Sequence, residues 1–190
     1  PPLAGKLFDE TGDRLTPSHT KKNGKRLRYY ISRRLVTERS RKHPDAWRLP
    51  AEGVESLLTK VIRQHLGRPE AVSTVMQGAS AVDILAAKKN LESYNGTKEN
   101  LMLVERADLQ PGSLTLQLDG QVLSQILECQ PDLINASGLT IQAPFRMRRR
   151  GVELKLHLGD AASEVDQTLV RNVVKACRWM EMAIKGTTFA

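Results

Sequence analysis

The stretch TPSHTKKNGKRLRYYISRR, residues 16–34, has an Asn-Gly pair at its centre, with a run of extended-type residues on each side. Asn and Gly tolerate the positive φ angles of a two-residue hairpin turn, so Asn23-Gly24 predicts a β-hairpin here. The stretch holds seven Lys or Arg and no acidic residue. We therefore expect a hairpin that displays positive charge with no carboxylate of its own to neutralise it.

The excess charge of the chain is confined to its first quarter. Residues 1–50 carry 13 Lys or Arg and 5 Asp or Glu, whereas the other 140 residues carry 16 of each sign, so the net charge of +8 belongs to the N-terminal part. Such asymmetry indicates a polyanionic partner. Nucleic acid is the first candidate and an anionic membrane surface is the second.

Composition limits the class of protein. Hydrophobic residues make up 40% and charged residues 26%, a balance typical of a folded globular chain. Cys129 and Cys177 lie far apart without a CxxC motif, which predicts two reduced thiols and neither a disulfide framework nor a metal quartet. No run approaches the roughly 18 apolar residues of a membrane span. The start has no signal-peptide pattern, so we expect a cytoplasmic chain, cut from a longer one because it begins at Pro-Pro without methionine.

The pattern of elements predicts an α+β fold in four parts. Residues 1–50 read as a small basic β-ribbon, residues 51–97 as a helical segment and residues 98–160 as an antiparallel β segment. Residues 161–190 contain one C-terminal amphipathic helix, expected over residues 164–185. Its apolar stripe consists of Val165, Leu169, Val173, Cys177, Met180 and Ile184.

Turn and cap signals place the boundaries. In the helical segment, a helix is expected to begin after Pro50 and to end at Gly67, and a later one should begin at the capping box formed by Ser80 and Asp83. A short helix precedes Gly78. The strands on either side of residues 111–112 should form a hairpin, residues 120–130 a short helix, and a last pair of strands should meet around residues 150–151. Residues 36–47 read as an irregular loop.

No catalytic or metal motif is present. The sequence lacks G-x-S-x-G, P-loop, G-x-G-x-x-G and H-E-x-x-H patterns, and its four histidines show no ligand spacing. Tyr29 and Tyr30 should point to opposite faces of a strand, which leaves one ring for a phosphate or sugar. The predicted nucleic-acid contacts on the ribbon are Lys21, Lys22, Lys25, Arg26, Arg28, Tyr29, Arg33 and Arg34. A second basic cluster in RMRRRG, residues 146–151, places Arg146, Arg148 and Arg150 on one strand face.

Three segments carry a family likeness. They are LAGKLFDETGDRLTPSHTKKNGKRLRYYIS at residues 3–32, PFRMRRRGVELKL at residues 144–156 and CRWMEMAIKG at residues 177–186. These resemble the region that follows the recombinase domain in large serine site-specific recombinases of the resolvase and invertase superfamily. The resemblance implies a prokaryotic, nucleoid-associated protein of DNA integration, inversion or excision, with double-stranded DNA as its partner. Residues 177–186 would then lead toward a helix-turn-helix.

The likeness has a departure in its zinc ribbon. Many members of that family carry zinc-binding cysteines there, whereas this chain has Asp9 and Thr11 near the first pair and Ser32 at the next position. Hydroxyls do not replace thiolates around Zn²⁺, so we expect a metal-free ribbon and no cofactor. An Asp9/His19/His43 metal site is the alternative.

The family's nucleophilic serine lies in a catalytic domain that this chain does not contain. We therefore expect a DNA-binding fragment that is not itself an enzyme, although its parent would exchange DNA strands. The first alternative is a protein–protein module for synapsis or oligomerisation, because such recombinases work as tetramers and the parent would be a homo-oligomer. The second is a general nucleic-acid-binding domain. An RNA-binding or membrane-surface protein fits less well, since an aromatic platform and a basic helix with bulky apolar anchors are both missing.

Overall fold

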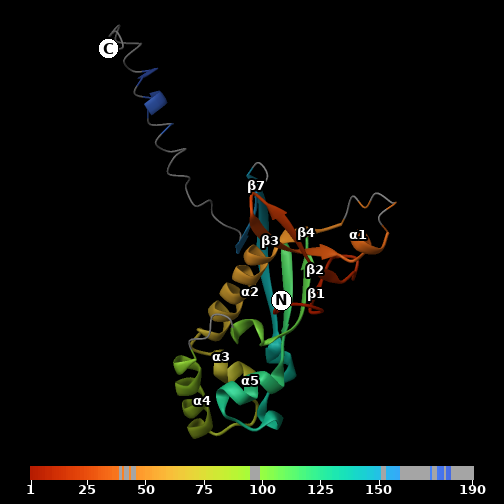
Figure 1. The fold of residues 1–190 in the computed structure, drawn as a ribbon. Helices are drawn as coiled ribbons and strands as arrows, with labels where there is room; N and C mark the ends of the chain where they lie inside the picture. The colour runs from red at the N-terminus through yellow and green to blue at the C-terminus, as the bar shows by residue number, and fades with distance from the viewer. Residues whose placement is uncertain are drawn as a thin grey trace. The chain divides into compact units, whose positions relative to one another are not determined.

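The computed structural model describes residues 1–38, 40, 43, 46–94, 99–150, 153–158, 172, 175–177 and 179–180. Contacts divide the chain into two compact units, residues 1–160 and residues 161–190. The first unit contains two β-sheets together with helices (Figure 1), which confirms the predicted α+β class.

The smaller sheet is antiparallel and holds the basic stretch. Its strand order is β2-β3-β4, with β2 at Leu15–Lys22, β3 at Lys25–Ser32 and β4 at Arg48–Pro50. Asn23 and Gly24 join β2 to β3 with φ angles of 51° and 75°. Two consecutive positive φ angles are typical of the type I′ turn, whose twist matches that of the strands. The predicted hairpin is therefore confirmed.

The larger sheet has the strand order β1-β5-β6-β7-β8. Its strands are β1 (Leu7–Phe8), β5 (Val104–Gln110), β6 (Ser113–Leu118), β7 (Thr140–Arg150) and β8 (Glu153–Leu158). The pairs from β5 to β8 are antiparallel, and Gly112 turns the β5–β6 hairpin with a φ of 88°, as predicted. Strand β1 adds a parallel pair with β5 that the sequence did not predict.

The helices begin and end close to their sequence signals. They are α1 (Arg34–Thr37), α2 (Ala51–Leu66), α3 (Ala71–Val75), α4 (Ala81–Ser93) and α5 (Gly120–Leu127), with 3-10 turns η1 (Glu99–Leu101), η2 (Pro131–Leu133) and η3 (Ala136–Leu139). Helix α2 follows Pro50 and ends at Gly67, and Ser80 forms the expected capping box with Asp83. The short helix α1 overlaps the start of the segment predicted to be irregular.

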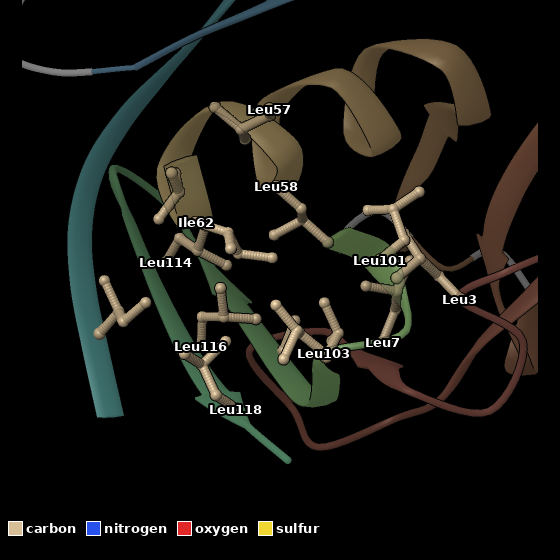
Figure 2. Close-up of a cluster of buried hydrophobic side chains, with 14 of the residues drawn as sticks. Leu3, Leu7, Leu57, Leu58, Ile62, Leu101, Leu103, Leu114, Leu116 and Leu118 are labelled. Carbon is tan, nitrogen blue, oxygen red and sulfur yellow. The ribbon is translucent and has the colours of Figure 1, made fainter. Parts of the chain in front are cut away.

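The core lies between α2 and the larger sheet. Leu58 and Ile62 of α2 face the leucines of η1 and β6, together with Leu103 just before β5, in Figure 2, and all of these side chains are buried. Leu3 and Leu7 enter the same cluster from the N-terminal segment. Because buried side chains of both sheets, among them Leu15, Tyr30 and Leu116, belong to one cluster, the small sheet and the larger sheet share a core.

The predicted C-terminal helix falls mostly outside the described residues. Residues 172, 175–177 and 179–180 have helical backbone with exposed side chains. Within the expected stripe, Cys177 and Met180 are described, and the other four positions are not. None of the described helices has the length and apolar character that crossing a lipid bilayer requires.

Candidate nucleic-acid interface

The hairpin tip is the most exposed basic surface of the smaller sheet. Every residue from 21 to 28 is exposed. In the register, Lys21 lies opposite Arg26 and Lys22 opposite Lys25. Because directly opposed residues share a face, Lys21 and Arg26 lie on one face of the ribbon, and Lys22 and Lys25 lie on the other. The tip thus presents cations to both sides.

The seven predicted basic contacts fall into two groups. Among the described residues, Lys21, Lys22, Lys25, Arg26 and Arg33 are exposed and make no ion pair. Arg28 and Arg34 are paired with carboxylates of the same chain. The first group can therefore neutralise phosphates directly, whereas the second already stabilises the fold.

Arg28 ties the hairpin to α2. Its two terminal nitrogens donate to the two carboxylate oxygens of Glu55, each at 3.0 Å, and the hydroxyl of Tyr30 donates to the same carboxylate at 3.0 Å. Burial and the negative charge of Glu55 raise the pKa of Tyr30, so its hydroxyl stays protonated as a donor. The pair ties the middle of β3 to α2.

Arg34 belongs to a network around the buried carboxylate of Asp9. One oxygen of Asp9 accepts from the Ser32 hydroxyl at 2.6 Å and from Arg34 at 2.7 Å. The other oxygen accepts from the Thr11 hydroxyl at 2.7 Å and from the backbone N–H of Asp13 at 3.0 Å. Burial alone would raise the pKa of Asp9, but the hydrogen bonds from Ser32 and Thr11 and the charge of Arg34 outweigh it and leave the pKa below its usual value.

The network brings together Ser32, which stands at a cysteine position of the resembling family, and Asp9 and Thr11, which stand near such positions. Asp9 contacts both Thr11 and Ser32 directly. The cation at this point is the Arg34 guanidinium. His19 is placed opposite Arg28 on the hairpin, four positions along β2 from the Leu15–Ser32 pair. No group of three or more His, Cys, Asp or Glu suited to a metal ion is found among the residues that the structure describes.

The second basic cluster lies on β7. Backbone pairing sets Arg146 opposite His157, Arg148 opposite Lys155 and Arg150 opposite Glu153. The side chain of Arg146 is exposed, whereas those of Arg148 and Arg150 lie outside the described residues. The predicted interface is thus described only in its ribbon part and at Arg146.

Two residues of this region escaped the sequence analysis. The Arg48 guanidinium lies 4.8 Å from the centre of the Tyr29 ring, so Tyr29 carries a cation on its face. Glu55 neutralises Arg28. Arg48 reaches Tyr29 through the β3–β4 pairing, and Glu55 lies 27 positions from Arg28, so neither contact had a local signal.

Comparison of the chain with protein-family models, with curated proteins and with solved structures finds no match.

Proposed function

We propose that this chain is a DNA-binding fragment of a serine site-specific recombinase, and that its β2–β3 hairpin grips the duplex backbone. The observation that carries the proposal is the exposed tip with four cations, Lys21, Lys22, Lys25 and Arg26, that make no ion pair among the described residues. The family assignment rests on the sequence resemblance alone. Strand exchange would belong to the parent protein in a prokaryotic cytoplasm.

The shape of the hairpin suits a duplex. A two-stranded β-ribbon fits the major groove of B-DNA. Cations on both faces of such a ribbon can reach the phosphates on either side of the groove. The anchored base, held by Glu55 and by the Asp9 network, fixes the direction in which the tip projects. Rigid presentation lowers the entropy lost on binding.

The test is the salt dependence of binding to a duplex, measured by fluorescence anisotropy. With five phosphate contacts from Lys21, Lys22, Lys25, Arg26 and Arg33, the log–log slope should be about −4.5. The double substitution Lys25→Ala/Arg26→Ala should flatten it by roughly 1.8 units, on any duplex sequence.

The matched control is Lys60→Ala/Lys89→Ala, which removes the same charge from exposed positions on α2 and α4. It should keep the parent's slope. If the control flattens the slope as much as the hairpin variant does, binding follows net charge and the hairpin is not the interface. Competition with single-stranded RNA distinguishes a general nucleic-acid-binding domain. From such a domain, the RNA would displace the labelled duplex as well as unlabelled duplex DNA does.

One observation favours a second function alongside the first. Val82 and Leu85 of α4 are 76% and 70% exposed, an i,i+3 pair of large apolar side chains on one face. Contiguous exposed apolar patches mark protein–protein contacts, and this pair would form the centre of such a patch. A synapsis or oligomerisation role for the helical segment predicts that Leu85→Glu lowers the mass of the protein in sedimentation at high concentration without changing duplex affinity.

A further inference from the structure

A pocket of about 540 Å³ opens at the C-terminal end of α2. Its lining residues come from the end of α2, from the start of α3, from α4 with Tyr94 after it, and from η1. The N-terminal end of α2 contacts the smaller sheet, and 16 residues of helix separate the two ends by about 24 Å. The pocket lies at the other end of α2 from the contact with the smaller sheet and is therefore distinct from the hairpin interface.

Three cations surround the pocket. Arg63 and Lys88 line it from α2 and α4, and Arg68 lines it from the turn that follows α2. None of the three makes an ion pair in the described part of the chain. Glu92 is the one acidic residue among the lining residues. With Glu92 counted against Arg63, Arg68 and Lys88, the lining residues that the structure describes carry an excess of positive charge.

The wall contributed by η1 holds a polar group without a protein partner. Asn100 is 5% exposed, lines the pocket and makes no side-chain hydrogen bond with the residues that the structure describes. Buried amides nearly always have a hydrogen-bond partner. An amide that has no protein partner and is reached from the cavity is suited to a ligand that can both donate and accept.

The remaining lining is apolar. Leu66 and Val72 are 6% and 2% exposed, and the partly buried Leu91 and Tyr94 stand beside them. These side chains provide a floor on which a flat, apolar group can pack. The volume lies within the range of small-molecule sites, which combine an apolar lining with a few polar groups that orient the ligand.

We propose that this pocket binds a phosphate ester with a planar body, of about the size of a nucleoside monophosphate. The phosphate is held by Arg63, Arg68 and Lys88, because guanidinium groups match phosphate oxygens in charge and geometry. The planar body packs on Leu66, Val72 and Tyr94, and the Asn100 amide pairs with the polar edge of the ring. A free nucleotide and the terminal nucleotide of a strand offer this same chemistry.

The test is calorimetric titration of the full chain with adenosine 5′-monophosphate at low salt. The nucleotide should bind at least about 10-fold more tightly than adenosine or inorganic phosphate, since each of these meets only half of the site. Arg63→Gln/Arg68→Gln should lower the affinity at least about 10-fold through the loss of charge-assisted hydrogen bonds. The control Lys60→Gln/Lys89→Gln removes two exposed cations outside the lining and should bind as the parent does.

Asn100→Leu gives a second, independent readout. It should weaken nucleotide binding while the melting temperature stays equal or rises, because no protein hydrogen bond is lost. The proposal is overturned if the nucleotide does not bind saturably, or if the control pair loses affinity as the arginine pair does. A melting temperature of Asn100→Leu well below the parent's would equally overturn the role of the amide.

Competition by a 5′-phosphorylated trinucleotide identifies the source of the ligand. If the trinucleotide displaces the bound nucleotide at a lower concentration than the mononucleotide does, the pocket binds a strand end. If it needs a higher concentration, the pocket binds a free nucleotide. Duplex binding with the parent's salt slope is expected for Arg63→Gln/Arg68→Gln. A result that contradicts nucleotide binding in the pocket can therefore be distinguished from a result that contradicts duplex binding by the hairpin.

Discussion

Asp9 is the residue on which the base of the hairpin depends. Its side chain is fully buried, and it joins the N-terminal turn, the end of β3 and α1 through Thr11, Ser32 and Arg34. Ser32 extends the network, because its hydroxyl accepts the backbone N–H of Trp47 at 2.9 Å. A buried carboxylate costs desolvation unless each lone pair has a donor, and here both oxygens are satisfied. The cluster therefore ties the N-terminal turn to the end of β3 and to α1 through hydrogen bonds and an ion pair.

Asp9→Asn should destabilise the protein by about 3 kcal/mol at pH 7, because it removes the buried carboxylate charge that the Arg34 guanidinium contacts at 2.7 Å. The pKa of Asp9 is lowered in the fold, so its contribution is fully present above its ordinary value and is lost as pH falls through the folded-state pKa. The difference between parent and variant in urea unfolding should thus shrink below about pH 4. The exposed neighbour change Glu10→Gln is the control, and an equal loss there would contradict this role.

At the scale of the element, local signals were sufficient for the turns and the helix starts, but not for strand pairing between distant segments. The Asn23-Gly24 turn and the Ser80–Asp83 capping box were predicted because each depends on a few adjacent residues whose backbone preferences are strong. The parallel pairing of β1 with β5 was not predicted, since it joins Leu7 to Ala107 across the whole helical segment. A two-residue strand has no periodicity to recognise.

The candidate site shows the same difference between what neighbouring residues predict and what contacts between distant residues decide. A count of basic residues treats Arg28 like Lys25, because the sequence of the hairpin contains no acidic residue. The carboxylate that neutralises Arg28 comes from Glu55, on the helix that packs beside β3. The tertiary packing therefore decides which cations remain available for phosphates. The sequence predicts only how many basic residues the hairpin contains.

Glu55→Gln tests how α2 restrains β3. Removing the charge frees Arg28, whose side chain is 48% exposed, to join the phosphate contacts, so duplex affinity should rise and the salt slope should steepen by about 0.9. Stability should fall by roughly 1 kcal/mol, because Arg28 and Tyr30 exchange a charged acceptor for a neutral one. Glu52→Gln makes the same change of charge at an exposed position on the first turn of α2. An equal gain from Glu52→Gln would show that the effect is merely one of net charge.

For the whole first unit, the shared core argues against independent modules. Leu3 and Leu7, which precede the hairpin, are fully buried in the same cluster as Leu58 of α2 and Leu116 of β6 (Figure 2). The smaller sheet has few large side chains of its own to bury, because the residues of its tip are exposed. Its stability must come from the core that it shares with α2 and the larger sheet.

Leu7→Ala should therefore unfold both sheets together. Emptying a fully buried leucine site costs about 2–5 kcal/mol. Trp47, which is 7% exposed and hydrogen-bonded to Ser32, reports on the smaller sheet through its fluorescence, while far-UV circular dichroism reports on the helices. Trp179 is 58% exposed and should add a nearly constant signal. In a cooperative unit the two probes shift by the same amount in denaturant. Leu27→Ala, at the exposed tip, should shift neither unfolding transition. If Leu7→Ala shifts the transition measured by circular dichroism but not the one measured by Trp47 fluorescence, the hairpin sheet folds on its own.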